Sequence, residues 1–148
     1  MNRIRTIRGV GTVPNVERVL LFGGRQGDFE KGYKILDFQV TATDPTSSEE
    51  VSAVVNTIEE PHAVTWNWAK NTQVAWAAWN IPINSRFGQY SNVDDEVILV
   101  EDVFIDFSGD AGQTINWELK LEEVSINDST AALAMVQARA QGLSLIHI

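Results

Sequence analysis

Apolar and polar residues alternate along two long stretches of the chain, and both stretches predict β-strands. Within the stretch 114–126, apolar side chains stand at every second position from residue 115 to residue 121, with acidic, basic or amide side chains between them. Successive side chains of a strand point to opposite faces, so this pattern gives one buried and one wet face. Residues 33–43 alternate in a similar way. The sets predicted to share a face are Ile115, Trp117, Leu119 and Leu121 in the first stretch, and Leu36, Phe38, Val40 and Ala42 in the second, with Tyr33 and Ile35 on the other side of the second.

Shorter apolar runs predict further strands. Residues 16–22 form one such run, and residues 96–107 form another that is long enough for a central strand. Residues 65–68 and 73–81 resemble the two strands of a hairpin, with residues 69–72 as the connection. All four segments are expected to belong to sheets.

Two segments between these runs are less regular. Ser48 followed by Glu49 and Glu50 resembles the start of a helix, whereas the β-branched residues up to Ile58 favour a strand, which is the interpretation adopted. Residues 82–95 are rich in Pro, Gly, Asn and Asp and are predicted to form a polar loop.

The predicted fold is mainly all-β, an antiparallel β-sandwich that is jelly-roll-like, with one C-terminal α-helix. Roughly seven to nine short strands separated by turn residues are typical of a two-sheet sandwich or of a barrel. Asn127 to Thr130 can cap a helix from about Ser129 to Ala140. The length favours a single domain, expected over residues 1–142.

The last six residues, 143–148, read Leu-Ser-Leu-Ile-His-Ile. This hexapeptide is the translation of a transposase end that is used to prepare sequencing libraries. Residues 143–148 are therefore expected to be an adapter-derived tail and are left out of the fold prediction. The alternative is a genuine apolar tail.

Charge is distributed unevenly along the chain. The net charge is −9, but residues 1–25 hold five arginines against one glutamate. We predict a basic N-terminal arm at about residues 1–15, in which Arg3, Arg5 and Arg8 are candidate interaction residues. Either this arm is a solvated terminus, or it faces a polyanion such as packaged nucleic acid or the acidic surface of a neighbouring subunit.

The residue types argue against most catalytic chemistry. There is no cysteine, and His62 is the only histidine before the tail, so neither a thiolate nucleophile nor a histidine-based metal site is expected. Calcium could bind carboxylates near Asp106 and Asp110, or those at residues 94–96, but their spacing matches no known loop. We predict no catalytic residue, no metal, no cofactor and no membrane segment.

Five tryptophans are the most distinctive residues. An exposed row of aromatic rings stacks on sugars or bases, whereas buried rings fill a core or an interface between subunits. Trp66 and Trp68 are two positions apart and are predicted to share a face, while Trp79 points away from Trp76. Trp79 and one residue of the pair Trp66 and Trp68 are expected to be exposed, and all three are candidate interaction residues.

The order of these features resembles that of virion structural proteins of marine bacteriophages, over about residues 31–141. Such proteins are small β-sandwiches that assemble in many copies on icosahedral particles, and the resemblance implies no catalytic residue. The segments that carry it are residues 33–38, 66–68, 73–76, 100–105 and 116–122, followed by a helix that ends near Gln141.

Three functional hypotheses follow. The first is a non-catalytic structural protein of a virus particle, located in the virion and acting through contacts with copies of itself and with other virion proteins. The alternative is a carbohydrate-binding β-sandwich module, possibly on a phage receptor-binding spike. The third is a hydrolase with two acids in a cleft. Its candidates, Glu118, Glu122 and Glu123, are predicted to lie on the solvent side of a strand or at its end.

Overall fold

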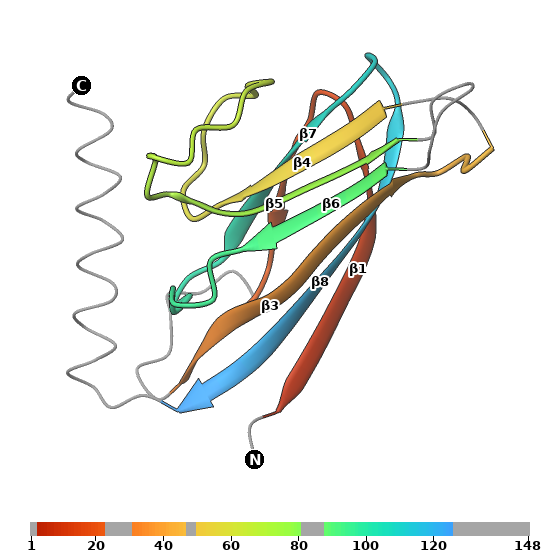
Figure 1. Ribbon diagram of the computed structural model, residues 1–148. Coiled ribbons are helices and arrows are strands. Elements are labelled where there is room, and N and C mark those ends of the chain that lie inside the picture. The colour runs from red at the N-terminus through yellow and green to blue at the C-terminus, as the bar shows by residue number, and fades with distance from the viewer. Residues whose placement is uncertain (1–2, 23–30, 47–49, 81–87, 126–148) are drawn as a thin grey trace.

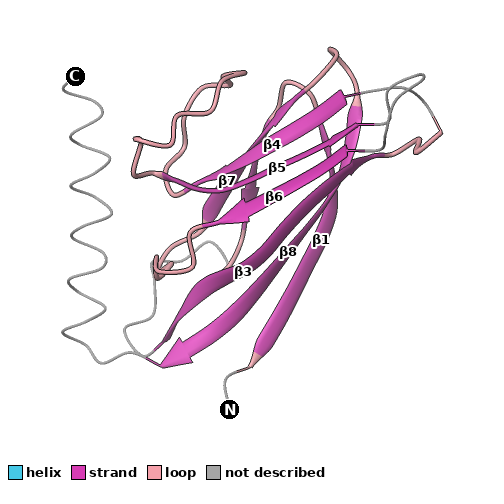
Figure 2. Cartoon of the chain, viewed as in Figure 1, coloured by secondary structure: helices cyan, strands magenta, loops and turns pink. Residues whose placement is uncertain are grey.

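The part of the chain that the structure describes forms eight β-strands in two antiparallel sheets (Figures 1 and 2). The computed structural model describes residues 3–22, 31–46, 50–80 and 88–125. This part of the chain contains no helix, and the expected helix, the tail at residues 143–148 and the glycine-rich residues 23–27 lie outside it. The strands are β1 (Ile4–Thr12), β2 (Val16–Val19), β3 (Lys31–Ala42), β4 (Glu50–Asn56), β5 (Gln73–Asn80), β6 (Gly88–Val93), β7 (Val103–Ser108) and β8 (Thr114–Ser125).

The smaller sheet has the order β1-β8-β3 and the larger has the order β2-β7-β4-β5-β6. Apolar residues of both sheets form one buried cluster between them, as a β-sandwich requires. The prediction of an all-β protein with two antiparallel sheets is confirmed. Trp117 of β8 also links the sheets, because its Nε1 donates a hydrogen bond of 3.1 Å to Glu17 of β2.

Strand β8 matches its predicted pattern closely. It occupies the centre of the smaller sheet and pairs with β1 on one side and β3 on the other. The four residues predicted to face inward are all buried, and the polar residues between them lie on the outer face. The backbone N–H and C=O groups of a central strand are hydrogen-bonded to a neighbouring strand on each side. Its side chains still alternate between the buried and the solvent-facing side of the sheet.

The faces of β3 differ from the prediction because the strand contains a bulge. Ile35 pairs with Leu121, but the next paired residue is Asp37, so Leu36 is an extra residue in the ladder. One extra residue reverses the alternation of side chains beyond it. Tyr33 and Ile35 therefore share the buried face with Phe38, and Leu36 is exposed.

Three predicted segments of the larger sheet need correction. Residues 65–68 form no strand and belong to a long connection between β4 and β5. Residues 88–93, predicted as loop, form the edge strand β6. Most of its residues are polar, so a search for apolar alternation does not detect it. The apolar run 96–107 contributes only its end, β7, while Leu99 makes an isolated bridge to Tyr33. Segments 16–22, 49–58 and 73–81 do contain strands, as predicted.

The expected basic arm is largely part of the sandwich. All nine residues of β1 pair with β8, from Ile4 opposite Glu122 to Thr12 opposite Thr114. Residues 4–12 are therefore an edge strand of the smaller sheet rather than a free arm.

A turn after β3 supplies a prediction on pH dependence. The Thr46 hydroxyl and the Thr46 amide both donate to Asp44 Oδ1, and these bonds, the hydroxyl first, lower the pKa of the exposed Asp44 carboxyl. A lowered pKa stabilises the folded state above the unfolded pKa, and this stabilisation disappears as the pH falls through the folded pKa. In a carboxyl NMR titration, Thr46→Val is expected to move the Asp44 midpoint upward. An unchanged midpoint would contradict this account of the turn.

Candidate functional site

The connection between β4 and β5, residues 57–72, is longer than the fold requires. The two strands are hydrogen-bonded neighbours, and such strands are usually joined by two to about five residues. In Figure 1 this β4–β5 loop is the yellow-green segment that extends beyond the ends of both strands. Long ordered loops on a rigid sheet are common carriers of function.

Asp106 of β7 anchors the first half of this loop. Its Oδ2 accepts a hydrogen bond of 2.9 Å from the Ala63 amide, and its Oδ1 lies 2.5 Å from His62 Nδ1. The Asp106 side chain is buried on the outer face of the larger sheet, opposite Val54 of β4 and away from the core. Both carboxylate oxygens therefore have partners, as a buried charge requires.

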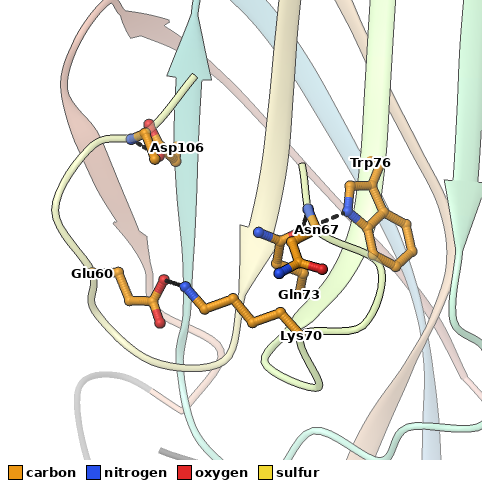
Figure 3. Close-up of polar contacts among 7 residues, drawn as sticks. Glu60, Asn67, Lys70, Gln73, Trp76 and Asp106 are labelled. Carbon is orange, nitrogen blue, oxygen red and sulfur yellow. Dashed lines mark hydrogen bonds and ion pairs between the residues drawn. The ribbon is translucent and has the colours of Figure 1, made fainter. Parts of the chain in front are cut away.

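Gln73, the first residue of β5, holds the second half of the loop. Its Oε1 accepts hydrogen bonds of 3.0 Å from the Asn67 amide and 3.0 Å from Trp76 Nε1 (Figure 3). Lys70 also forms an ion pair with Glu60 across the loop (Figure 3). Two donors on one oxygen fix the orientation of the Gln73 amide. The loop is thus tied to the sheet at both of its halves.

Two tryptophans of the loop pack against aromatic residues of the sheet. We call these four residues, Trp66, Trp68, Trp76 and Tyr90, the aromatic cluster. The ring of Trp66 lies 5.9 Å from that of Tyr90 in β6, and the ring of Trp68 lies 5.9 Å from that of Trp76 in β5. Such distances and tilted rings are favourable for aromatic pairs. Trp68 is nevertheless 63% exposed and Tyr90 40% exposed. The loop therefore holds large apolar rings at the surface.

The predictions for the tryptophans are confirmed in part. Trp68 is the exposed member of its pair, and Trp66 is half-buried. The prediction for Trp79 is wrong, because this residue is 3% exposed. Trp79 and Trp76 do point to opposite faces of β5, but the core covers one face, and the β4–β5 loop covers Trp76 on the other.

The three candidate arginines do not form one basic surface. Arg5 donates to the carbonyl of Leu21 at 3.0 Å, and its guanidinium lies 5.7 Å from the centre of the Tyr33 ring. Arg8 lies on the exposed face of β1 and pairs with Glu118 at 3.0 Å, while Arg3 is exposed before β1 begins. Arg5 thus makes contacts within the fold.

A polar depression of about 520 Å³ lies between the β4–β5 loop and the outer face of the larger sheet. Most of its polar lining comes from amide and carboxylate side chains, as Figure 3 shows for the labelled ones. The lining residues are Val54, Asn56, Glu60, Pro61, Ala63, Thr65, Asn67, Ala69, Lys70, Gln73 and Asp106.

The acids of this depression are engaged in contacts that hold the loop. The contact of His62 Nδ1 with Asp106 resembles the part of a catalytic triad that orients the histidine. A triad also needs a hydroxyl hydrogen-bonded to Nε2, and within the described ranges no such bond is found. Among the same residues, no group of three or more histidine or acidic side chains is placed to bind a metal ion. Glu118, a candidate for hydrolysis, pairs with Arg8 on the smaller sheet.

Comparisons with known proteins add no assignment. No protein-family model matches this chain, and no curated protein matches it. A search of the described segments for a helix long and apolar enough to cross a membrane finds none. The functional argument therefore depends on strand order and on the site itself.

Sequence reasoning missed the loop anchors and the depression. His62 and Asp106 are 44 positions apart, and only the register of β7 with β4 brings the loop to this carboxylate. The one feature of the sequence that could have indicated an anchor is the pair of adjacent polar residues, Thr72 and Gln73, at the start of an apolar strand.

Proposed function

We propose that this protein is a non-catalytic structural component of a virus particle, acting through contacts with copies of itself and with other virion proteins. The observation that carries the proposal is the order of the eight strands. Jelly rolls contain eight strands in two sheets and recur in viral capsid proteins and in lectins.

The strand pairing resembles that of a jelly roll, which supports the proposal. In that fold the chain behaves as a long hairpin that is rolled up, so that the first strand pairs with the last and the second with the seventh. Here β1 pairs with β8, β2 pairs with β7, and β4 pairs with β5. The pair β3 and β6 departs from that fold, because β6 pairs with β5 in the larger sheet. The two strands are nevertheless in contact, since the Ser91 hydroxyl of β6 donates to the Phe38 carbonyl of β3 at 2.7 Å.

The aromatic cluster supports assembly as the mode of action. Tryptophan and tyrosine are enriched at the centres of protein interfaces, where their large rings leave water together. Trp68 and Val64, which is 71% exposed, are the large apolar side chains that the β4–β5 loop leaves at the surface, and we call them the apolar tip of this loop. We infer that this tip is buried in contacts between subunits.

The assembly proposal predicts self-association that depends on Trp68. In sedimentation analysis of the full chain over a range of concentrations, the protein is expected to form oligomers, and Trp68→Ser is expected to weaken their formation at least tenfold. The physical reason is loss of the largest exposed apolar side chain on the loop.

Val10→Ser is the matched control, because Val10 is 57% exposed but lies on β1 of the other sheet. Its oligomers are expected to resemble those of the wild type. A chain that stays monomeric at every concentration would overturn the proposal, as would equal effects of the two substitutions.

A second candidate function is a carbohydrate-binding module, such as part of a receptor-binding spike. The observation that favours it is the exposed Trp68 ring beside a polar depression, since sugar rings present an apolar face and polar edges. A titration of the full chain with glycans, in which tryptophan fluorescence reports binding, tests this candidate.

A further inference from the structure

We infer that the polar depression beneath the β4–β5 loop binds one neutral sugar residue of a glycan, with Asn56 and Gln73 as the amides that recognise its hydroxyls. The inference rests on the second candidate function and assigns it a site. The exposed ring of Trp68 lies against Trp76, whose Nε1 is bonded to the lining residue Gln73, so the ring is close enough to the depression to receive the next sugar.

An irregularity in the larger sheet places the two amides side by side. Val55 pairs with Ala75, but Asn56 pairs with Gln73, so Val74 is an extra residue in β5. Without it, Gln73 would share the inner face with Ala75. Bulges of this kind re-aim side chains next to functional sites. Gln73 is turned to the outer face, directly opposite Asn56, where paired residues have Cβ atoms about 5 Å apart.

Unpartnered polar atoms concentrate at this position. Within the described part of the chain, three buried side-chain atoms have no hydrogen-bond partner: Asn56 Oδ1, Thr57 Oγ1 and Thr72 Oγ1. All three residues lie at the base of the β4–β5 loop, where Thr57 donates its amide to the Thr72 carbonyl at 2.9 Å. Asn56 is only 4% exposed and lines the depression. Of the three residues, only Asn56 lines the depression. Buried polar groups are normally satisfied, so its unpartnered acceptor indicates a place that is organised for a polar ligand.

The charges around the depression select a neutral ligand. Both oxygens of Asp106 are occupied, by the Ala63 amide and by His62, and Glu60 is paired with Lys70, so these acids are engaged within the protein. The groups that remain are amides, which both donate and accept hydrogen bonds, as sugar hydroxyls do. The Gln73 oxygen already accepts two bonds, which leaves its amino group as a donor for the ligand. The volume of about 520 Å³ lies within the usual range for small-molecule sites.

The test is a titration of the full chain, labelled with nitrogen-15, with glucose, galactose, mannose, N-acetylglucosamine and their disaccharides. Binding of at least one sugar is expected to shift the side-chain amide signals of Asn56 and Gln73 in a saturable way. A disaccharide is expected to bind more tightly than its monosaccharide, because its second ring reaches Trp68.

Two variants locate the site. Thr65→Phe places a ring in the depression and is expected to weaken binding at least tenfold, whereas Val64→Phe, at the adjacent exposed position outside the lining, is expected to bind as the wild type does. Asn56→Leu keeps the branching of the side chain, with a larger volume that the adjoining depression can take up, and removes the unpartnered acceptor. It is expected to lose sugar binding while its unfolding midpoint stays equal or rises.

The possible results distinguish an error in the proposed site from an error in the proposed carbohydrate-binding function. If no sugar in the panel binds, both the site and the carbohydrate function are overturned. If a sugar binds and Trp68→Ser abolishes binding, while Thr65→Phe and Asn56→Leu do not, the function stands and the site is overturned. A large loss of stability in Asn56→Leu would also overturn the site, because it would show that Asn56 serves the fold.

Discussion

Replacing Asp106 with alanine is expected to lower the free energy of unfolding by about 3 kcal/mol. Two charge-assisted hydrogen bonds are lost, each worth roughly 1.5–3 kcal/mol, and part of this loss is recovered as water reaches the freed groups. The partners left behind are the Ala63 amide and His62, both on the β4–β5 loop. Chemical denaturation measures the stability, and hydrogen exchange of residues 57–72 measures release of the loop.

Two further variants define the origin of this effect. Asp106→Asn keeps one acceptor oxygen and is expected to lose about half as much as the alanine variant. Asp95→Ala, which removes an exposed acid, is expected to change stability by less than about 0.5 kcal/mol. Equal stability of Asp106→Ala and the wild type would mean that the loop is held by other contacts.

Replacing Gly11 with valine is expected to lower the free energy of unfolding by about 3 kcal/mol. Gly11 lies in β1, and a Cβ atom built on it would overlap the ring of Phe107 in the facing sheet. Phe107 is fully buried, so its ring has no free space to move into. Forcing carbon atoms into a well-packed core costs roughly 1–3 kcal/mol, and more where the neighbour is rigid. Thermal and chemical denaturation both report this change.

The neighbouring strand position provides the control. Val10 is 57% exposed, and Val10→Ala is expected to change stability by less than about 0.5 kcal/mol. In the double variant, Phe107→Leu should partly offset Gly11→Val, because a smaller side chain opens space for the new methyl groups. Additive losses in the double variant would show that the two positions do not meet.

The sequence predicted the elements whose side chains follow a simple period. Strand β8 shows this best, since its apolar residues alternate with polar ones from Ile115 to Leu121 and all four apolar residues are buried. Strand β3 shows where prediction from alternation fails. Leu36 is apolar and fits the alternation of Phe38 and Val40, so nothing in the local pattern reveals the bulge. The bulge is fixed by pairing with β8, which is a tertiary contact.

The candidate site was less predictable for a related reason. Trp79 was expected to be exposed because it points away from Trp76, yet both faces of β5 are covered. One cover is the core, and the other is a loop whose position depends on Asp106, far away in the chain. Alternation reports which residues share a face of a sheet, but it does not report what lies over that face.

The hydrogen bond from the Thr57 amide to the Thr72 carbonyl closes the β4–β5 loop at its base. Strand pairing on the near side of this closure is made by residues 50–56 and 73–80, and the free energy of closing a loop changes only slowly with its length. Residues 58–71 are therefore an insertion point, where a foreign recognition peptide could be grafted provided that the contacts of the loop with Asp106 and Gln73 are kept. Natural variation at this position would change what the molecule recognises while leaving the sandwich as it is.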